Sequence, residues 1–92
     1  MLAETATASK ESSDEWTRSW LQREIVKGIE LLPPEQRQVF VMHELEGKSF
    51  KQIAAETGVS VNTLLSRKRY AVYFLLRRLK DIYEDFLTLV RS

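Results

Sequence analysis

The stretch from Gly58 to Arg69, GVSVNTLLSRKR, gathers side chains that could do chemistry on a nucleic acid. It carries hydroxyls, an amide and three consecutive basic residues, and such groups hydrogen-bond to base edges and phosphates. The residues that follow, up to Val90, are as apolar as a core helix. The segment from Gly58 to Val90 therefore resembles a nucleic-acid-binding helix in its first part and an apolar surface for a partner protein in its second part.

A basic block occupies the middle of the chain. The net charge of all 92 residues is +1, yet residues 47–80 hold eight Lys or Arg and one Glu, which gives this segment +7. Residues 1–46 carry −4 and residues 81–92 carry −2. Such a block is expected of a surface that contacts phosphates, although a solvated helix face also accounts for one.

The composition argues against an enzyme and against a metal centre. The chain has no Cys and one His, His43, so no disulfide, thiolate zinc site or nucleophile–base pair can be assembled. Glu44 and Glu46 face different sides of a helix and cannot act as an acid–base pair. The three glycines form no phosphate-binding loop. We therefore expect no catalysis, no cofactor and no metal.

The N-terminal residues predict neither a leader nor an anchor. They have no basic start followed by an apolar segment, so they do not resemble a signal peptide. No apolar run approaches the roughly 18 residues of a membrane span. We expect a soluble, cytoplasmic protein that does not contact a membrane.

Helical periodicity predicts an all-α fold with four helices. Residues 1–11 are small and polar and predict a disordered lead-in, and Ser12 with Glu15 forms a capping-box pattern. The apolar face of the first helix is expected at Trp16, Trp20, Ile25, Ile29 and Leu32. Trp16 and Trp20 are expected to be core anchors.

Proline and glycine mark the ends of the next two helices. Pro33 ends the first helix, and Pro34 starts a second that stops at Gly47. Its buried side is expected at Val39, Phe40, Met42 or His43, and Leu45. Ser49 is the expected N-cap of a third helix with Phe50, Ile53 and Ala54 inside, and Ser60 that of a fourth opening at Val61.

The third and fourth helices have the spacing of a helix-turn-helix. Ala54 lies four residues before Gly58, where a small side chain lets the two helices cross closely. Gly58 suits a turn that needs a positive φ. Ile53, Val59 and Leu64 are apolar where the pair must share a core. The second helix of such a pair enters the major groove of DNA.

The string LPPEQRQVFVMHELEGKSFKQIAAETGVSVNTLLSR resembles region 4 of bacterial sigma factors, most closely the extracytoplasmic-function group. The likeness covers about Trp20 to Leu79. The matching positions are Leu32-Pro33, Gln36-Arg37, Glu44–Gly47, Ser49-Phe50, Ile53-Ala54, Gly58–Ser60, Thr63-Leu64 and Ser66-Arg67.

The resemblance implies a bacterial domain that recognises a −35-like promoter element in double-stranded DNA and docks on RNA polymerase. By position it places six residues at the groove-facing end of the recognition helix: Ser60, Asn62, Thr63, Leu65, Ser66 and Arg67. Base-edge contacts are expected from Asn62, Thr63, Ser66 and Arg67, and phosphate contacts from Lys48, Lys51, Lys68 and Arg69.

The chain departs from this family at several positions. Leu65 stands where a basic residue usually touches DNA, and Tyr70 and Val72 replace further basic residues. A sigma factor also has a region 2, which binds polymerase and melts the −10 element, and no such region is present here. We therefore expect either an excised domain or a free-standing region 4-like protein.

The last helix continues beyond the family's usual end near Leu79. We expect a helix-turn-helix domain over residues 12–79 and an extension of its last helix over residues 80–92. Apolar residues step by 3 and 4 along this helix, as in a coiled-coil seam. The expected dimer or partner seam consists of Val72, Leu75, Leu76, Leu79, Ile82, Tyr83, Phe86 and Leu89.

Two sets of alternatives remain open on the sequence alone. The seam could pack on Trp16, Trp20 and Ile25 of the first helix, on a second copy in a homodimer, or on another protein such as a sigma or anti-sigma factor. The function could be DNA reading. It could instead be a protein-interaction module that keeps the sigma fold and binds a sigma factor, an anti-sigma factor or polymerase.

Overall fold

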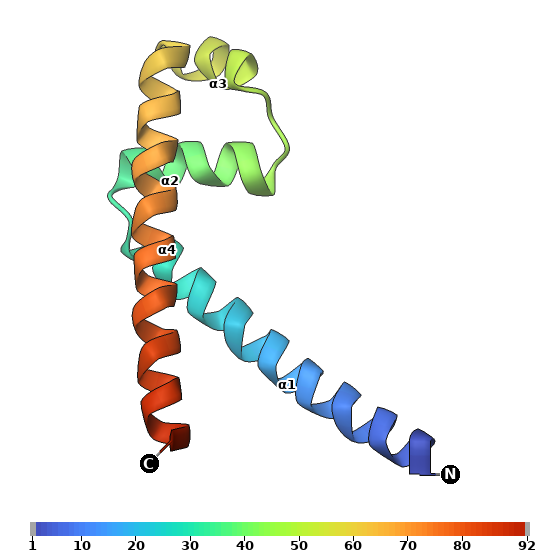
Figure 1. Ribbon diagram of the computed structural model, residues 1–92. Coiled ribbons are helices and arrows are strands. Elements are labelled where there is room, and N and C mark those ends of the chain that lie inside the picture. Colours follow the sequence, from blue (N-terminus) through green and yellow to red (C-terminus); the bar gives the residue numbers. More distant parts are fainter. Residues whose placement is uncertain (1, 92) are drawn as a thin grey trace.

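The computed structural model describes the backbone of residues 2–91 and the side chains of residues 15–91. Its elements are α1 (Leu2–Leu31), α2 (Pro34–Phe40), the π-helix η1 (Val41–Leu45), α3 (Phe50–Thr57) and α4 (Val61–Arg91). Within residues 2–91 there is no strand, which confirms the all-α prediction. Figure 1 shows α4 as a long straight rod, with α2 and α3 near its N-terminal end and α1 leaving it at an angle.

Helix α1 is longer than the sequence pattern predicts. It begins at Leu2, whereas the capping-box pattern predicts a start at Ser12 and a disordered segment before it. Residues 2–11 contain no Gly or Pro and include several good helix formers, so nothing local stops the helix there. Its other end is as predicted, because α1 stops at Leu31 and Pro34 opens α2.

The junction between α1 and α2 is held by one arginine. Arg37 Nε donates a hydrogen bond to the carbonyl of Ile29 at 3.3 Å, and its Nη2 donates to the carbonyls of Glu30 at 3.1 Å and Leu32 at 2.9 Å. These carbonyls belong to the last turn of α1 and the residue after it, where a helix has no further amides to offer. Arg37 therefore caps α1 from within α2.

Two small apolar clusters join the other elements to α4. The first cluster is Ile29, Leu32, Ala71 and Leu75, with Ile25, Phe40 and Val41 packed against it. The second is Val39, Ile53 and Leu64, with Met42, Phe50, Ala54 and Val59 packed against it. The predicted core positions of the helix-turn-helix are therefore confirmed.

Two residues expected to be buried are exposed. Trp16 is 60% exposed because α1 diverges from α4 toward its N-terminus, and only Trp20 of the two tryptophans reaches α4, 6.3 Å from the Phe86 ring. Leu45 is 66% exposed. Residues Val41–Leu45 form a π-helix, which has more residues per turn than an α-helix. The Leu45 side chain therefore points in a different direction than in an α-helix and does not reach the buried side.

The helix-turn-helix has the local features that its sequence predicts. Ser49 Oγ accepts a hydrogen bond from the Gln52 amide, and the Gln52 side chain accepts one from the Ser49 amide, which completes a capping box for α3. Gly58 ends α3 with φ of 74°, in the left-handed region. Its amide bonds to the Ala54 carbonyl at 2.9 Å. The turn therefore needs this backbone conformation.

We predict that Gly58→Ala destabilises the chain by about 1–2 kcal/mol, because a Cβ disfavours the left-handed region. Nothing lies within 4 Å of where that Cβ would be, so the backbone conformation alone accounts for the loss. Urea unfolding followed by circular dichroism measures it, and Gly58→Asn should lose less. An alanine variant as stable as the wild type would contradict this account of the turn.

Candidate nucleic-acid interface

Three of the predicted DNA-contacting residues share an exposed face at the start of α4. Asn62, Ser66 and Arg69 follow one another at spacings of four and three, so they lie on one side of the helix. All three are exposed, whereas Leu64, on the other side, is buried against Ile53 and Val39. We call Asn62, Ser66 and Arg69 the reading face.

Ser60 and Thr63 are engaged in starting the helix. Ser60 Oγ accepts a hydrogen bond from the Thr63 amide at 3.2 Å and donates one to Thr63 Oγ1 at 2.9 Å. Both side chains remain exposed. They cap α4 and leave its first turn open toward a ligand.

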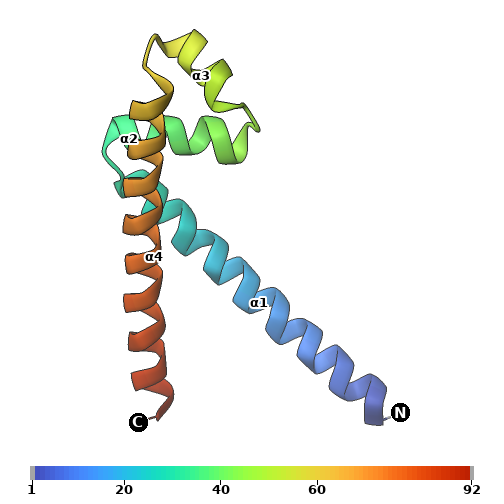
Figure 2. The ribbon, with the colours of Figure 1, turned by 45° about the horizontal axis from the view of Figure 1, so that its top comes forward.

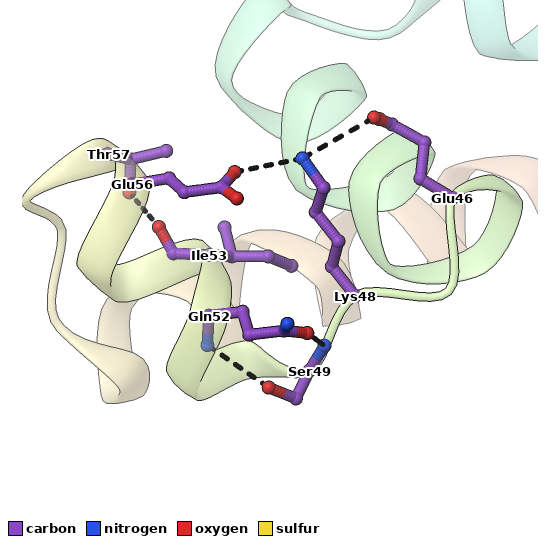
Figure 3. A network of polar contacts seen from close by, with 7 residues as sticks. All are labelled: Glu46, Lys48, Ser49, Gln52, Ile53, Glu56 and Thr57. Carbon is purple, nitrogen blue, oxygen red and sulfur yellow. Dashed lines mark hydrogen bonds and ion pairs between the residues drawn. The ribbon is translucent and has the colours of Figure 1, made fainter.

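Lys48 lies between two carboxylates, as Figure 3 shows. Its Nζ is 2.9 Å from Glu56 Oε2 on α3 and 3.7 Å from Glu46 Oε1. The hydrogen bond to Glu56 is the largest cause that raises the pKa of Lys48; desolvation opposes it, and the negative charges of Glu56 and Glu46 add to the rise. A cation predicted to contact phosphate is therefore already paired with two acids.

Arg67 and Lys68 point to the flanks of α4 and not along the reading face. Arg67 Nη2 lies 3.6 Å from Glu35 Oε2 at the start of α2. Lys68 Nζ donates a hydrogen bond to Glu44 of η1 and lies 5.6 Å from the centre of the Phe50 ring. This hydrogen bond and the lysine charge lower the pKa of the Glu44 carboxyl.

Lys51 and Arg69 are the cations of the predicted set that have no ion pair in the described part of the chain. Both are exposed. The structure thus separates the predicted basic residues into a free pair and a group of three held by carboxylates. Sequence reasoning missed Glu35, Glu44 and Glu56 because each lies 8 to 32 positions from its partner in the sequence, and only folding brings the two together.

A hollow adjoins the reading face. Leu65 is 40% exposed and lines this hollow together with Phe50, Val72, Tyr73 and the two cations Lys68 and Arg69. The Leu65 side chain can meet a thymine methyl group or a protein partner, but it cannot hydrogen-bond. The replacement of the family's usual basic residue by Leu65 therefore changes the exposed surface and not the core.

The predicted seam is divided between the chain's own core and solvent. Leu75 is buried against α1, and Val72, Leu79 and Ile82 are half-buried. The remaining members are exposed, namely Leu76, Tyr83, Phe86 and Leu89. Helix α1 therefore covers Leu75 and contacts Phe86 through Trp20, while Leu76, Tyr83 and Leu89 remain exposed to solvent.

His43 has a structural place in this region. Its Nδ1 lies 2.9 Å from the Lys48 carbonyl oxygen, and its ring stacks on Phe50 at 4.1 Å between centroids. Among the residues that the structure describes, no group of His, Asp and Glu could hold a metal ion. In the same part of the chain, no helix combines the length and the apolar character needed to cross a membrane.

Comparison with known protein families gives one match. The model of the family described as Sigma-70, region 4 matches residues 22–71, which span the end of α1 through the first third of α4. No curated protein and no solved structure matched the chain.

We predict that the Glu44 carboxyl titrates below its ordinary value of 4.5, and that Lys68→Met moves its pKa back up. Because the folded pKa is the lower one, the pair stabilises the fold above the unfolded-state pKa and loses this contribution as the pH falls through the folded-state pKa. Carbon-13 NMR of the carboxyl group measures the titration. Lys80→Met serves as the control, and an equal shift in both variants would contradict a specific Lys68–Glu44 pair.

Proposed function

This chain belongs to the sigma-70 region 4 family, and from that premise we propose that it reads a −35-like promoter element in double-stranded DNA with the start of α4. Region 4 of sigma-70 factors is a helix-turn-helix domain that acts in transcription initiation and is not an enzyme. We also propose that the domain docks on RNA polymerase and that two copies pair through the seam.

The observation that carries this proposal is the reading face. Asn62, Ser66 and Arg69 are exposed on the first turns of the second helix of a helix-turn-helix, and these are the turns that meet base edges in this motif. Asn bonds adenine, Ser bonds a base or a phosphate, and Arg bonds guanine or phosphate. Lys51 on α3 is also exposed and would supply a further phosphate contact.

The sequence pattern assigned a base contact to Arg67 and a phosphate contact to Arg69. The ion pair of Arg67 with Glu35, and the position of Arg69 on the same side as Asn62 and Ser66, favour the opposite distribution. We propose that Arg69 makes the specific contact and that Arg67 acts at the flank, with Lys48 and Lys68 reaching phosphates only after they leave their carboxylates.

A second candidate function is a protein-interaction module that keeps the sigma fold without reading DNA. It is favoured by the exposed Leu65 on the recognition helix and by the three basic residues already paired with acids. The partner would be a sigma factor, an anti-sigma factor or polymerase. This function allows essentially no affinity for duplex DNA at physiological salt, whereas DNA reading requires an affinity that falls steeply with salt.

We predict that Arg69→Ala weakens binding to a −35-like duplex by about 1–3 kcal/mol and relaxes preference at one base pair. Arg67→Ala should weaken binding less, because Glu35 holds that side chain away from the reading face. Fluorescence anisotropy with a panel of single-base duplex variants measures both effects. A larger loss for Arg67→Ala, with preference relaxed there instead, would restore the assignment made from sequence.

We predict that Glu44→Gln/Glu56→Gln binds duplex DNA more tightly than the wild type, because Lys68 and Lys48 become free for phosphates. Each additional phosphate contact steepens the slope of log K against log salt by about 0.9, so the slope should steepen by up to about 2. Glu84→Gln, at the far end of α4, is the matched control. An unchanged slope in the double variant would show that these lysines do not approach the DNA.

A further inference from the structure

We propose that the chain has a second nucleic-acid site, which takes a single strand. In this site the exposed rings of Tyr70, Tyr73 and Phe74 stack on bases, and Arg77 contacts the phosphates. One supporting observation, the continuity of the site with the reading face, rests on the proposed function. The site itself uses other residues, so the two proposals are tested separately.

The site is a hollow between α4 and the turn that joins α1 to α2. Leu31, Pro33 and Gln36 form its wall on the side of the turn, and Tyr70, Tyr73, Phe74 and Arg77 form its wall on α4. Figures 1 and 2 both show this turn beside the middle of α4. We call this place the aromatic hollow. Its volume of about 690 Å³ lies within the range of roughly 300–1,000 Å³ that is usual for ligand-binding clefts.

The three rings of the aromatic hollow have surface that the chain itself does not cover. Tyr70 and Tyr73 are 61% and 62% exposed, and Phe74 is 38% exposed. Among the described side chains, none of the three stacks on another ring or lies under a cation, whereas Phe50 does both. Their ring faces are therefore available to a ligand, and exposed apolar side chains gathered in this way mark an interaction surface.

The charges around the aromatic hollow favour an anionic ligand. Arg77 lines it and Arg69 precedes Tyr70, and neither arginine has an ion pair in residues 15–91. Among the same residues, no acidic side chain lines the hollow. Glu35, beside Gln36 in the chain, is held by Arg67 at 3.6 Å. A ligand that combines flat rings with negative charge fits these walls, and a nucleic acid has both.

The rings favour a single strand over a duplex. In a duplex the faces of the bases are covered by stacking, so proteins reach base edges and phosphates, largely by hydrogen bonds. Phe74 and Leu31 have no side-chain group that can hydrogen-bond. In a single strand the bases can unstack and lie on aromatic rings, while nearby cations contact the backbone. The aromatic hollow offers these two kinds of contact together.

The aromatic hollow continues the reading face along α4. Tyr73 follows Ser66 by seven residues and Arg69 by four, and Arg77 follows Tyr73 by four, so these side chains lie on one side of the helix. Because α4 is one continuous helix from Val61 to Arg91, this alignment is fixed. Continuity with a surface that is proposed to bind DNA favours a nucleic acid over a protein segment as the occupant.

The test titrates the full chain into fluorescent oligothymidylate and oligouridylate of about ten nucleotides, a length within the usual range of single-strand sites. Anisotropy should show binding to at least one of them, and the ratio of the two affinities tells DNA from RNA. Tyr70→Ala/Tyr73→Ala should weaken binding at least about fivefold for each ring removed. Tyr73→Phe keeps the ring and should bind as the wild type does. Tyr83→Ala, which removes an exposed tyrosine outside the hollow, is the matched control.

Two further variants separate this site from the reading face. Arg77→Gln should reduce the slope of log K against log salt for the single strand by about 0.7, the loss of one phosphate contact. Asn62→Ala, on the reading face, should weaken binding to a −35-like duplex and leave single-strand binding unchanged. Tyr70→Ala/Tyr73→Ala should show the reverse pattern. Circular dichroism checks that each variant keeps its helical content.

The proposal is overturned if the wild type binds neither oligonucleotide at low salt. It is also overturned if Tyr70→Ala/Tyr73→Ala binds as the wild type does, or if Tyr83→Ala weakens binding equally. Self-association in light scattering that only Tyr70→Ala/Tyr73→Ala abolishes, without single-strand binding, assigns the hollow to a protein contact instead. A wild type that binds the single strand but no duplex refutes the proposed function and leaves the aromatic hollow in place.

Discussion

Helix α4 has neither Gly nor Pro between Val61 and Arg91, so nothing interrupts its backbone hydrogen bonds over 31 residues. Helices α1, α2 and α3 all pack against it. One rigid axis therefore sets the position of the reading face, the apolar clusters and the C-terminal half of the seam. Moving any one of them relative to the others would require breaking this helix.

Few apolar residues pack against α4, and they cover its N-terminal part more fully than its C-terminal part. The buried apolar residues form only two clusters, around Leu64 and around Leu75. The hydrogen bonds of Arg37 fix the end of α1 beside the cluster around Leu75. Gly28 allows α1 to approach Leu75 closely. Beyond this crossing the two long helices diverge, and the Trp20 and Phe86 rings, 6.3 Å apart between centroids, still bring them into contact. Tyr83 and Leu89 stay exposed there.

Local rules predicted the helix-turn-helix because each of its features is encoded within a few residues. The Ser49 N-cap, the positive φ of Gly58 and the Pro34 start depend on neighbours along the chain, and all three occur as predicted. The π-helical turn and the exposure of Trp16 depend instead on how whole helices meet. No short sequence pattern carries that information, so hydrophobic periodicity could predict neither the π-helix nor the exposure of Trp16.

The same distinction applies to the charge of the interface. Counted along the sequence, residues 47–80 are strongly basic, but folding brings Glu35 and Glu44 from the acidic segment onto Arg67 and Lys68. Glu56, the one acid inside the block, lies on Lys48. The surface offered to phosphates is therefore less basic than the segment. On the proposed function, DNA would have to compete with these carboxylates, so the unpaired Arg69 on the reading face would contribute more than the number of lysines around it.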